Sequence, residues 1–148
     1  MEATTVTLSR NFIINDGGRA DAGFKGRTRD CVVRAVAIST GGNYRTIYRE
    51  VNAMGLRIDG VKSCARTGVP LNTVNEFMKQ AGFEYVVLPQ TSKDRTNLAN
   101  YIAPSGNVVL DLAGHTVASI DGVLHDTFDT RTSKYGRRIV RGYFRLKA

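Results

Sequence analysis

Apolar residues recur at helical spacing through the first part of this 148-residue chain. The spacing predicts three helices, over residues 31–40, 44–54 and 70–80, and a shorter one over residues 96–102. The first, CVVRAVAIST, is nearly all apolar, so we expect it to be buried on most sides. Thr28 or Asp30 can cap this helix, and Gly41 and Gly55 are expected to end the first two helices. We interpret residues 56–70 as a loop.

Short apolar or alternating runs in the second half predict strands. The candidates are residues 84–88, 107–112, 115–120, 123–128 and 138–146, with one short strand, residues 11–14, near the start. Asp121-Gly122 is typical of a two-residue hairpin turn. Helices come first and antiparallel strands after, which predicts an α+β domain whose N-terminal helix packs on an antiparallel sheet. We expect one domain over residues 1–148, with residues 1–29 largely irregular.

Composition and charge narrow the class of protein. Hydrophobic residues make up 42% and charged residues 23%, as in ordinary globular chains, and no apolar run reaches the roughly 20 residues that cross a bilayer. With no secretory signal pattern in view, we expect a cytoplasmic protein without a membrane partner. The net charge of +8 makes an anionic partner conceivable. Tyr135, Tyr143 and Phe144 interleave the basic C-terminal residues, so nucleic-acid binding is kept as the least favoured alternative.

The cysteines and histidines are too scattered for a metal site. Cys31, Cys64, His115 and His125 form no short paired ligand spacing, and we expect neither a metal nor a cofactor. In a reducing cytosol, two free thiols are favoured over one disulfide. We interpret Cys64 as an incidental loop residue and His125 as a solvent-facing hairpin residue.

Cys31 begins the most apolar of the predicted helices. The aligned peptide dipoles and unpaired N–H groups at a helix N-terminus stabilise a thiolate, and the same N–H groups can bind a developing oxyanion. A nucleophilic cysteine is favoured at this position.

The hairpin predicts a histidine and an acid side by side. A two-residue turn at Asp121-Gly122 makes His115 and Asp126 diagonal neighbours on one face of the sheet. Asp129 falls on the other face and is the second choice as the orienting acid, although a bulge would exchange the two. With Cys31, these residues supply a nucleophile, a general base and acid, and an orienting carboxylate.

At these residues the chain resembles the papain-like cysteine peptidase superfamily in a minimal form. Asp30-Cys31 at the start of an apolar helix resembles the Asp-Cys of bacteriocin-processing peptidases, and Gly114-His115 before a strand resembles the superfamily's His segment. Asp126-Thr127-Phe128 resembles papain's Asn-Ser-Trp, where the amide orients the His and the aromatic ring shields the pair. Residues 15–40 and 114–129 are also similar to a group of small bacteriophage proteins.

The resemblance implies a papain-like fold and a phage-encoded cysteine hydrolase in the cytoplasm of the host cell. Its substrate would be a protein or peptide, such as a host protein, cleaved at a peptide, isopeptide or other amide bond, and transfer to an amine stays open. The superfamily usually carries a Gln shortly before the Cys. Here Lys25 takes that place and is, with the Cys31 backbone N–H, the candidate oxyanion donor. The alternative is a catalytically inactive papain-like fold that binds or inhibits a host factor.

Overall fold

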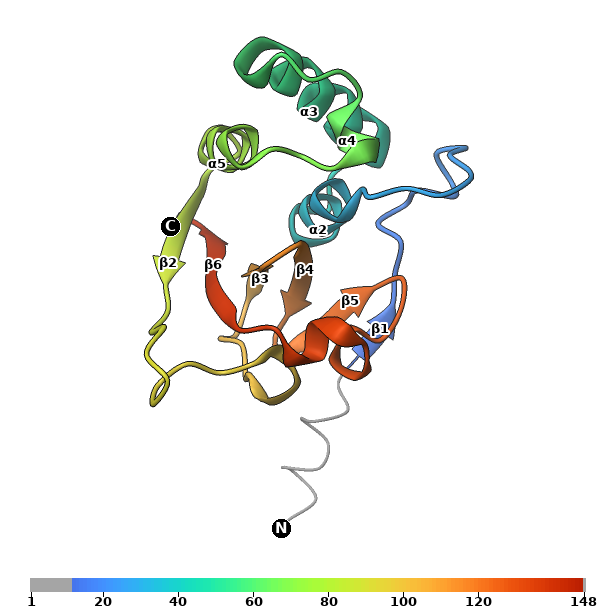
Figure 1. Ribbon diagram of the computed structural model, residues 1–148. Coiled ribbons are helices and arrows are strands. Elements are labelled where there is room, and N and C mark those ends of the chain that lie inside the picture. The colour runs from blue at the N-terminus through green and yellow to red at the C-terminus, as the bar shows by residue number, and fades with distance from the viewer. Residues whose placement is uncertain (1–11, 148) are drawn as a thin grey trace.

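The computed structural model describes residues 12–147, and in it the helices gather on one side of a six-stranded sheet (Figure 1). The strand order is β1-β5-β4-β3-β6-β2. The strands are β1 (Phe12–Ile14), β2 (Phe83–Val87), β3 (Asn107–Leu112), β4 (His115–Ile120), β5 (Val123–Asp126) and β6 (Val140–Leu146). Every neighbouring pair is antiparallel except β1 and β5, which are parallel. The α+β class is as predicted, whereas a purely antiparallel sheet is wrong.

β1 is the strand that makes the sheet mixed. It pairs with β5 over three positions, from Phe12 opposite Leu124 to Ile14 opposite Asp126. The helices and three strands lie between β1 and β5 in the chain, and this long crossover is the kind of connection that parallel strands need. A strand of three residues gives no local signal of its direction. Asn11, which was expected to begin this strand, lies outside the described residues.

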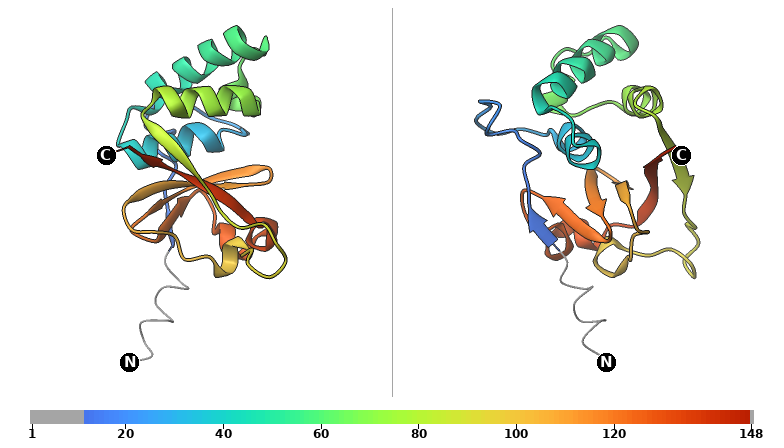
Figure 2. Two further views of the ribbon diagram at one scale, coloured as in Figure 1. Left: turned by 90° about the vertical axis from the view of Figure 1, so that its left-hand side faces the viewer. Right: turned by 180° about the vertical axis from the view of Figure 1, so that it is seen from behind.

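The helices form two layers on the sheet. They are α2 (Cys31–Thr40), α3 (Tyr44–Asp59), α4 (Cys64–Thr67) and α5 (Leu71–Gln80). Three short 3-10 turns lie between strands: η1 (Leu98–Asn100) between β2 and β3, and η2 (Thr130–Thr132) and η3 (Lys134–Arg137) between β5 and β6. α2 lies directly on β4 and β3, and α3 covers the opposite side of α2 (Figure 2). This central place explains why α2 is nearly all apolar: both its sheet side and its helix side are covered. Among residues 12–147, every helix is too short or too polar to cross a membrane.

α3 does not end at Gly55. It continues to Asp59 and stops at Gly60, whose φ of 67° is the left-handed conformation common after a helix. Gly55 is needed for close packing instead, since a side chain there would collide with the sulfur of Cys64. The loop interpretation of residues 56–70 is therefore wrong: Cys64 starts α4 and is fully buried against α3.

Three other predicted elements are shorter in the structure. The expected helix at residues 96–102 is only the 3-10 turn η1. The last strand starts at Val140 because the residues before it form η3. The expected strand at residues 123–128 ends at Asp126, where β5 leaves the sheet.

The β4–β5 hairpin has the predicted register. Asp121 (φ 50°) and Gly122 (φ 85°) both have positive φ, as a type I′ turn requires. Ala118 lies opposite His125, which places His125 on the face away from Asp126. His125 is half-buried and contacts the Asn15 amide. The same register brings the start of β4 next to the end of β5, beneath α2.

Candidate active site

Cys31 is the first residue of α2 and its thiol is free. Asp30, which precedes it, makes no side-chain capping bond to the helix. Its carboxylate is fully buried and bonds instead to Arg34 and the Tyr44 hydroxyl. The first-turn N–H groups of α2 therefore have no side-chain cap, and their partial positive charge remains available to the sulfur or to a bound oxygen atom.

The side chains of His115 and Asp126 meet across the hairpin. His115 begins β4, Asp126 ends β5, and the distance from His115 Nε2 to Asp126 Oδ2 is 2.6 Å. His115 also lies near the Cys31 thiol, since the two side chains line the same cavity and act on each other's pKa. Because Nε2 faces Asp126, Nδ1 is the nitrogen left for the sulfur. The structure thus brings the three predicted site residues together, although they come from α2, β4 and β5.

These contacts shift the pKa values of the thiol and the imidazole in opposite directions. Burial alone would raise the pKa of Cys31, but His115, the Thr116 backbone N–H and the charge of Arg34 together lower it. Burial alone would lower the pKa of His115, but the hydrogen bond with Asp126 and the interaction with Cys31 outweigh it and raise this pKa to about 9. Both shifts favour a thiolate beside an imidazolium over the neutral pair.

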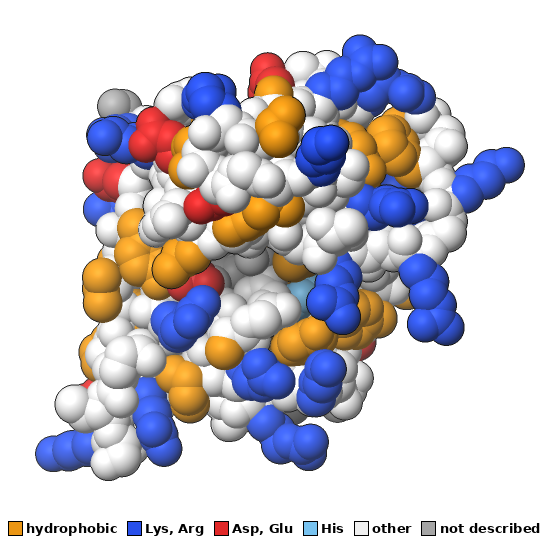
Figure 3. Space-filling model, turned by 45° about the horizontal axis from the view of Figure 1, so that its top comes forward, with side chains coloured by type: hydrophobic (Ala, Val, Ile, Leu, Met, Phe, Trp, Pro, Cys, Tyr) orange, Lys and Arg blue, Asp and Glu red, His pale blue; other side chains and the backbone are white. Residues whose placement is uncertain are grey.

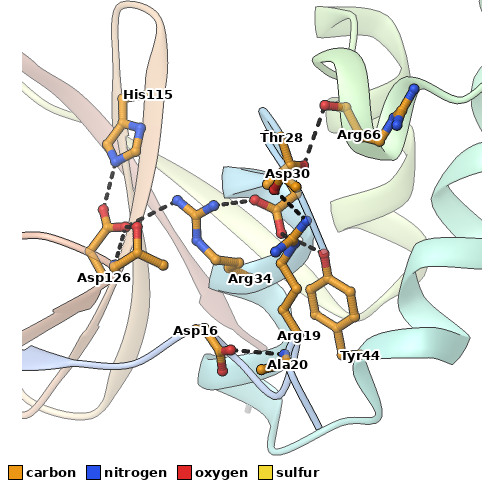
Figure 4. A network of polar contacts seen from close by, with 12 residues as sticks. Asp16, Arg19, Ala20, Thr28, Asp30, Arg34, Tyr44, Arg66, His115 and Asp126 are labelled. Atoms are coloured by element: carbon orange, nitrogen blue, oxygen red, sulfur yellow. Dashed lines mark hydrogen bonds and ion pairs between the residues drawn. The ribbon is translucent and has the colours of Figure 1, made fainter. Parts of the chain in front are cut away.

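Arg34 connects Asp126 to α2 (Figure 4). Its guanidinium donates to Asp126 Oδ1 at 3.0 Å and also pairs with the buried carboxylate of Asp30. The Thr127 backbone N–H donates to the same Asp126 oxygen at 2.7 Å. Burial would raise the pKa of Asp126, but His115, Arg34 and Thr127 lower it, so the carboxylate stays ionised.

An aromatic wall shields the imidazole. Tyr135 from η3 stacks on His115, with ring centroids 4.4 Å apart and an angle of 16° between the planes. Phe128, the position that resembles papain's Trp, lies 5.8 Å from the His115 ring at a tilt of 40°. Stacking on an electron-rich ring favours the charged imidazole.

A cavity of about 660 Å³ opens over these residues, and both Cys31 and His115 line it. Lys25, the sequence candidate for an oxyanion donor, is exposed and does not line the cavity. Asp129 is also not the partner of His115, because it pairs with Arg131 at 2.9 Å and caps η2. The Cys31 backbone N–H, the other sequence candidate for an oxyanion donor, lies at the start of α2.

Sequence reasoning missed two members of this site. Arg34 interrupts the apolar run of α2, and a charge in a buried helix requires a partner, which was the available signal. Tyr135 was interpreted as one aromatic among basic residues, and no local pattern indicated that it would stack on His115.

Cys64 lies away from the site. Its sulfur is buried beneath α3 and contacts the Val51 carbonyl oxygen at 3.5 Å. Burial raises its pKa, which is the opposite of the shift at Cys31. Within the described part of the chain, no three His, Cys, Asp or Glu side chains cluster so that they could hold a metal ion. In comparisons with protein-family models, with curated proteins and with solved structures, nothing matches this chain.

Proposed function

We propose that this protein is a cysteine hydrolase with a papain-like fold, which cleaves a peptide, isopeptide or other amide bond through a thioester. The observation that carries the proposal is the position of His115, which is hydrogen-bonded to Asp126 and lines one cavity together with Cys31, whose pKa it lowers. Cys31 is the nucleophile, His115 the acid and base, and Asp126 the group that orients the imidazole. Cys64 shows the contrasting case of a buried structural cysteine, because burial raises the pKa of its thiol.

In the first half-reaction, the Cys31 thiolate attacks the carbonyl carbon of the amide. A C–S bond forms and the carbonyl electron pair moves onto oxygen, where the backbone N–H groups at the start of α2 can stabilise it. The C–N bond then breaks, and the imidazolium of His115 gives its proton to the departing amine. This leaves a free amine, a neutral imidazole and a thioester on Cys31.

In the second half-reaction, water attacks the thioester while neutral His115 takes a proton from it. The C–S bond breaks, a carboxylic acid leaves, and the thiolate and imidazolium are restored. An amine in place of water would give transfer by the same steps. Asp126 stays ionised throughout and stabilises the imidazolium whenever it forms.

The test compares peptide-bond cleavage by the intact protein with cleavage by the variants Cys31→Ala and His115→Ala. A complex peptide mixture is treated with each protein, and new amino groups and carboxyl groups are counted by mass spectrometry. The proposal predicts new ends with the wild type, none with Cys31→Ala, and a loss of roughly 100-fold or more with His115→Ala. A wild type that generates no more ends than Cys31→Ala would leave the binding-protein alternative.

A reactive-thiol probe supplies the matched control. Cys31 should be labelled at neutral pH by a thiol-reactive vinyl sulfone, and the label on Cys31 should fall in His115→Ala. Comparing the same cysteine in two proteins avoids the effect of burial that slows labelling of Cys64. Equal labelling of Cys31 in both proteins would contradict the proposed role of His115.

A further inference from the structure

The cavity over Cys31 carries an excess of basic side chains. Among residues 12–147, Asp111 is the only acidic residue that lines it, whereas the basic lining residues are Arg29, Arg34, Lys134, Arg138 and Arg141. Two of these are neutralised within the protein: Arg34 pairs with Asp30 and Asp126, and Arg141 pairs with Asp111 at 2.9 Å.

The other three have no such partner. No carboxylate among residues 12–147 forms an ion pair with Arg29, Lys134 or Arg138. Arg138 instead donates to the Ala113 carbonyl oxygen at 2.6 Å, which holds its head beside the turn that precedes His115. Charges lining a concave surface with one sign concentrate ions of the opposite sign there.

Two of these cations lie against Tyr135, the ring that stacks on His115. Lys134 Nζ is 5.2 Å and the Arg138 guanidinium carbon 5.7 Å from the centre of the Tyr135 ring, and Tyr135 itself stacks on His115. Both positive charges lie against the same ring, so an anionic group bound in the cavity would be attracted to both.

The cavity continues as a groove. A second cavity, of about 680 Å³, lies over α5, β2 and β6 and shares Leu71, Val74, Asp111, Thr116 and Arg141 with the first. Figure 3 shows this face as a hollow between the helices and the strands, with basic side chains at its rim. Two adjoining cavities with shared lining residues fit an extended chain better than a small amide.

We propose that the groove binds an acidic segment of polypeptide, with a carboxylate of that segment lying against Lys134 and Arg138 next to the cleaved bond. This specificity rests on the proposed amide hydrolysis at Cys31. A nucleic acid is less suited to the site because the three aromatic residues that interleave the basic C-terminal segment offer it little free ring surface. Tyr135 is stacked on His115, while Tyr143 and Phe144 are only 9% and 6% exposed.

The first test uses the charge of thiol reagents. Rates of modification of Cys31 by the anionic sulfonatoethyl and the cationic trimethylammonioethyl methanethiosulfonate give a ratio that reports the potential at the sulfur. In Arg29→Glu/Lys134→Glu the anion-to-cation ratio should fall roughly tenfold or more at low salt. The control Arg49→Glu/Lys93→Glu changes the net charge equally at exposed positions outside both cavities and should keep the wild-type ratio. Equal ratios in both double variants would overturn the proposal.

The second test uses peptides as competitors. Hexaglutamate should slow modification of Cys31 by neutral iodoacetamide, the effect should weaken with added salt, and hexalysine should have none. If the double variant does not fold, the single variant Lys134→Gln replaces it. In this variant, hexaglutamate should protect Cys31 less than in the wild type. Stronger protection by oligothymidylate than by hexaglutamate, or no protection by either, would overturn the proposal.

The outcomes separate this inference from the proposed function. A thiol of ordinary reactivity that still prefers the anionic reagent would contradict the hydrolase and keep the acidic-segment groove. A reactive thiol with no charge preference would contradict the acidic-segment groove and keep the hydrolase.

Discussion

Arg34 Nη2 and Asp126 Oδ1 lie 3.0 Å apart and join α2 to the end of β5. Both side chains are buried, with exposed fractions of 9% and 2%. Cys31 stands on the same helix as Arg34, and Asp126 holds the imidazole of His115. One helix therefore positions the thiol directly and, through Arg34 and Asp126, orients the imidazole.

Removing this guanidinium should destabilise the fold. Arg34→Met leaves the carboxylates of Asp30 and Asp126 buried without it, and we expect the free energy of unfolding to fall by about 3–5 kcal/mol. Urea unfolding measures this change. Arg34→Lys, which keeps the charge but not the two-sided geometry, should lose less. A change below about 1 kcal/mol in Arg34→Met would mean that the ion pairs do not hold α2 to the sheet.

Asp126 and Asp129 form a matched pair for testing the orienting acid. In Asp126→Asn the imidazole loses its ionised partner, so the pKa of His115 should fall from about 9 toward its ordinary value of 6.5. Modification of Cys31 at neutral pH should slow accordingly. Asp129→Asn should leave both properties unchanged, because Asp129 pairs with Arg131. Nuclear magnetic resonance titration of the His115 ring measures the pKa directly, and a shift in Asp129→Asn alone would reverse the assignment.

The same carboxylate predicts a pH dependence of stability. The pKa of Asp126 in the folded protein is below its ordinary value of 3.8, so its stabilising contribution is full above 3.8 and is lost as the pH falls through the lowered pKa. The difference in melting temperature between wild type and Asp126→Asn should be large at about pH 6 and shrink at about pH 3. Thermal unfolding followed by circular dichroism measures it. A difference that grows in acid would contradict the ionised state.

Tyr135 should act through its ring and not through its hydroxyl. Tyr135→Phe keeps the stack on His115 and should behave like the wild type. Tyr135→Ala removes a contact worth about 0.5–1.5 kcal/mol and opens the imidazole to water. We therefore expect a lower His115 pKa and several-fold slower Cys31 modification at neutral pH, measured as a full pH–rate profile. Loss of reactivity in Tyr135→Phe would instead assign a role to the hydroxyl.

Local signals in the sequence were sufficient for the elements that carry the site. The apolar run after Asp30 predicted α2 and placed Cys31 at its start. Asp121-Gly122 fixed the hairpin register, because both positions must adopt positive φ, and that register put His115 beside Asp126. These features depend on residues that are close together in the chain.

Packing between distant segments was not predictable in the same way. Glycine ends many helices, but Gly55 lies within α3. A side chain at this position would collide with Cys64 of α4, and this contact between distant segments leaves no local signal in the sequence. β1 joins the sheet through three residues and gives no sign of its parallel direction. The meeting of α2 with β4 depends on burial of the whole helix and has no signature at Cys31 or His115.

The ionisation of Cys31 tests the central claim most directly. The ultraviolet absorbance of the thiolate, taken as the difference between wild type and Cys31→Ser across a pH titration, reports the charge on this sulfur alone. We predict a thiolate already present at neutral pH, well below the ordinary thiol pKa of 9.0, and its loss in His115→Gln. A wild-type thiol that stays protonated until the pH approaches 9.0, with the same titration in His115→Gln, would contradict the thiolate–imidazolium pair on which the proposed chemistry depends.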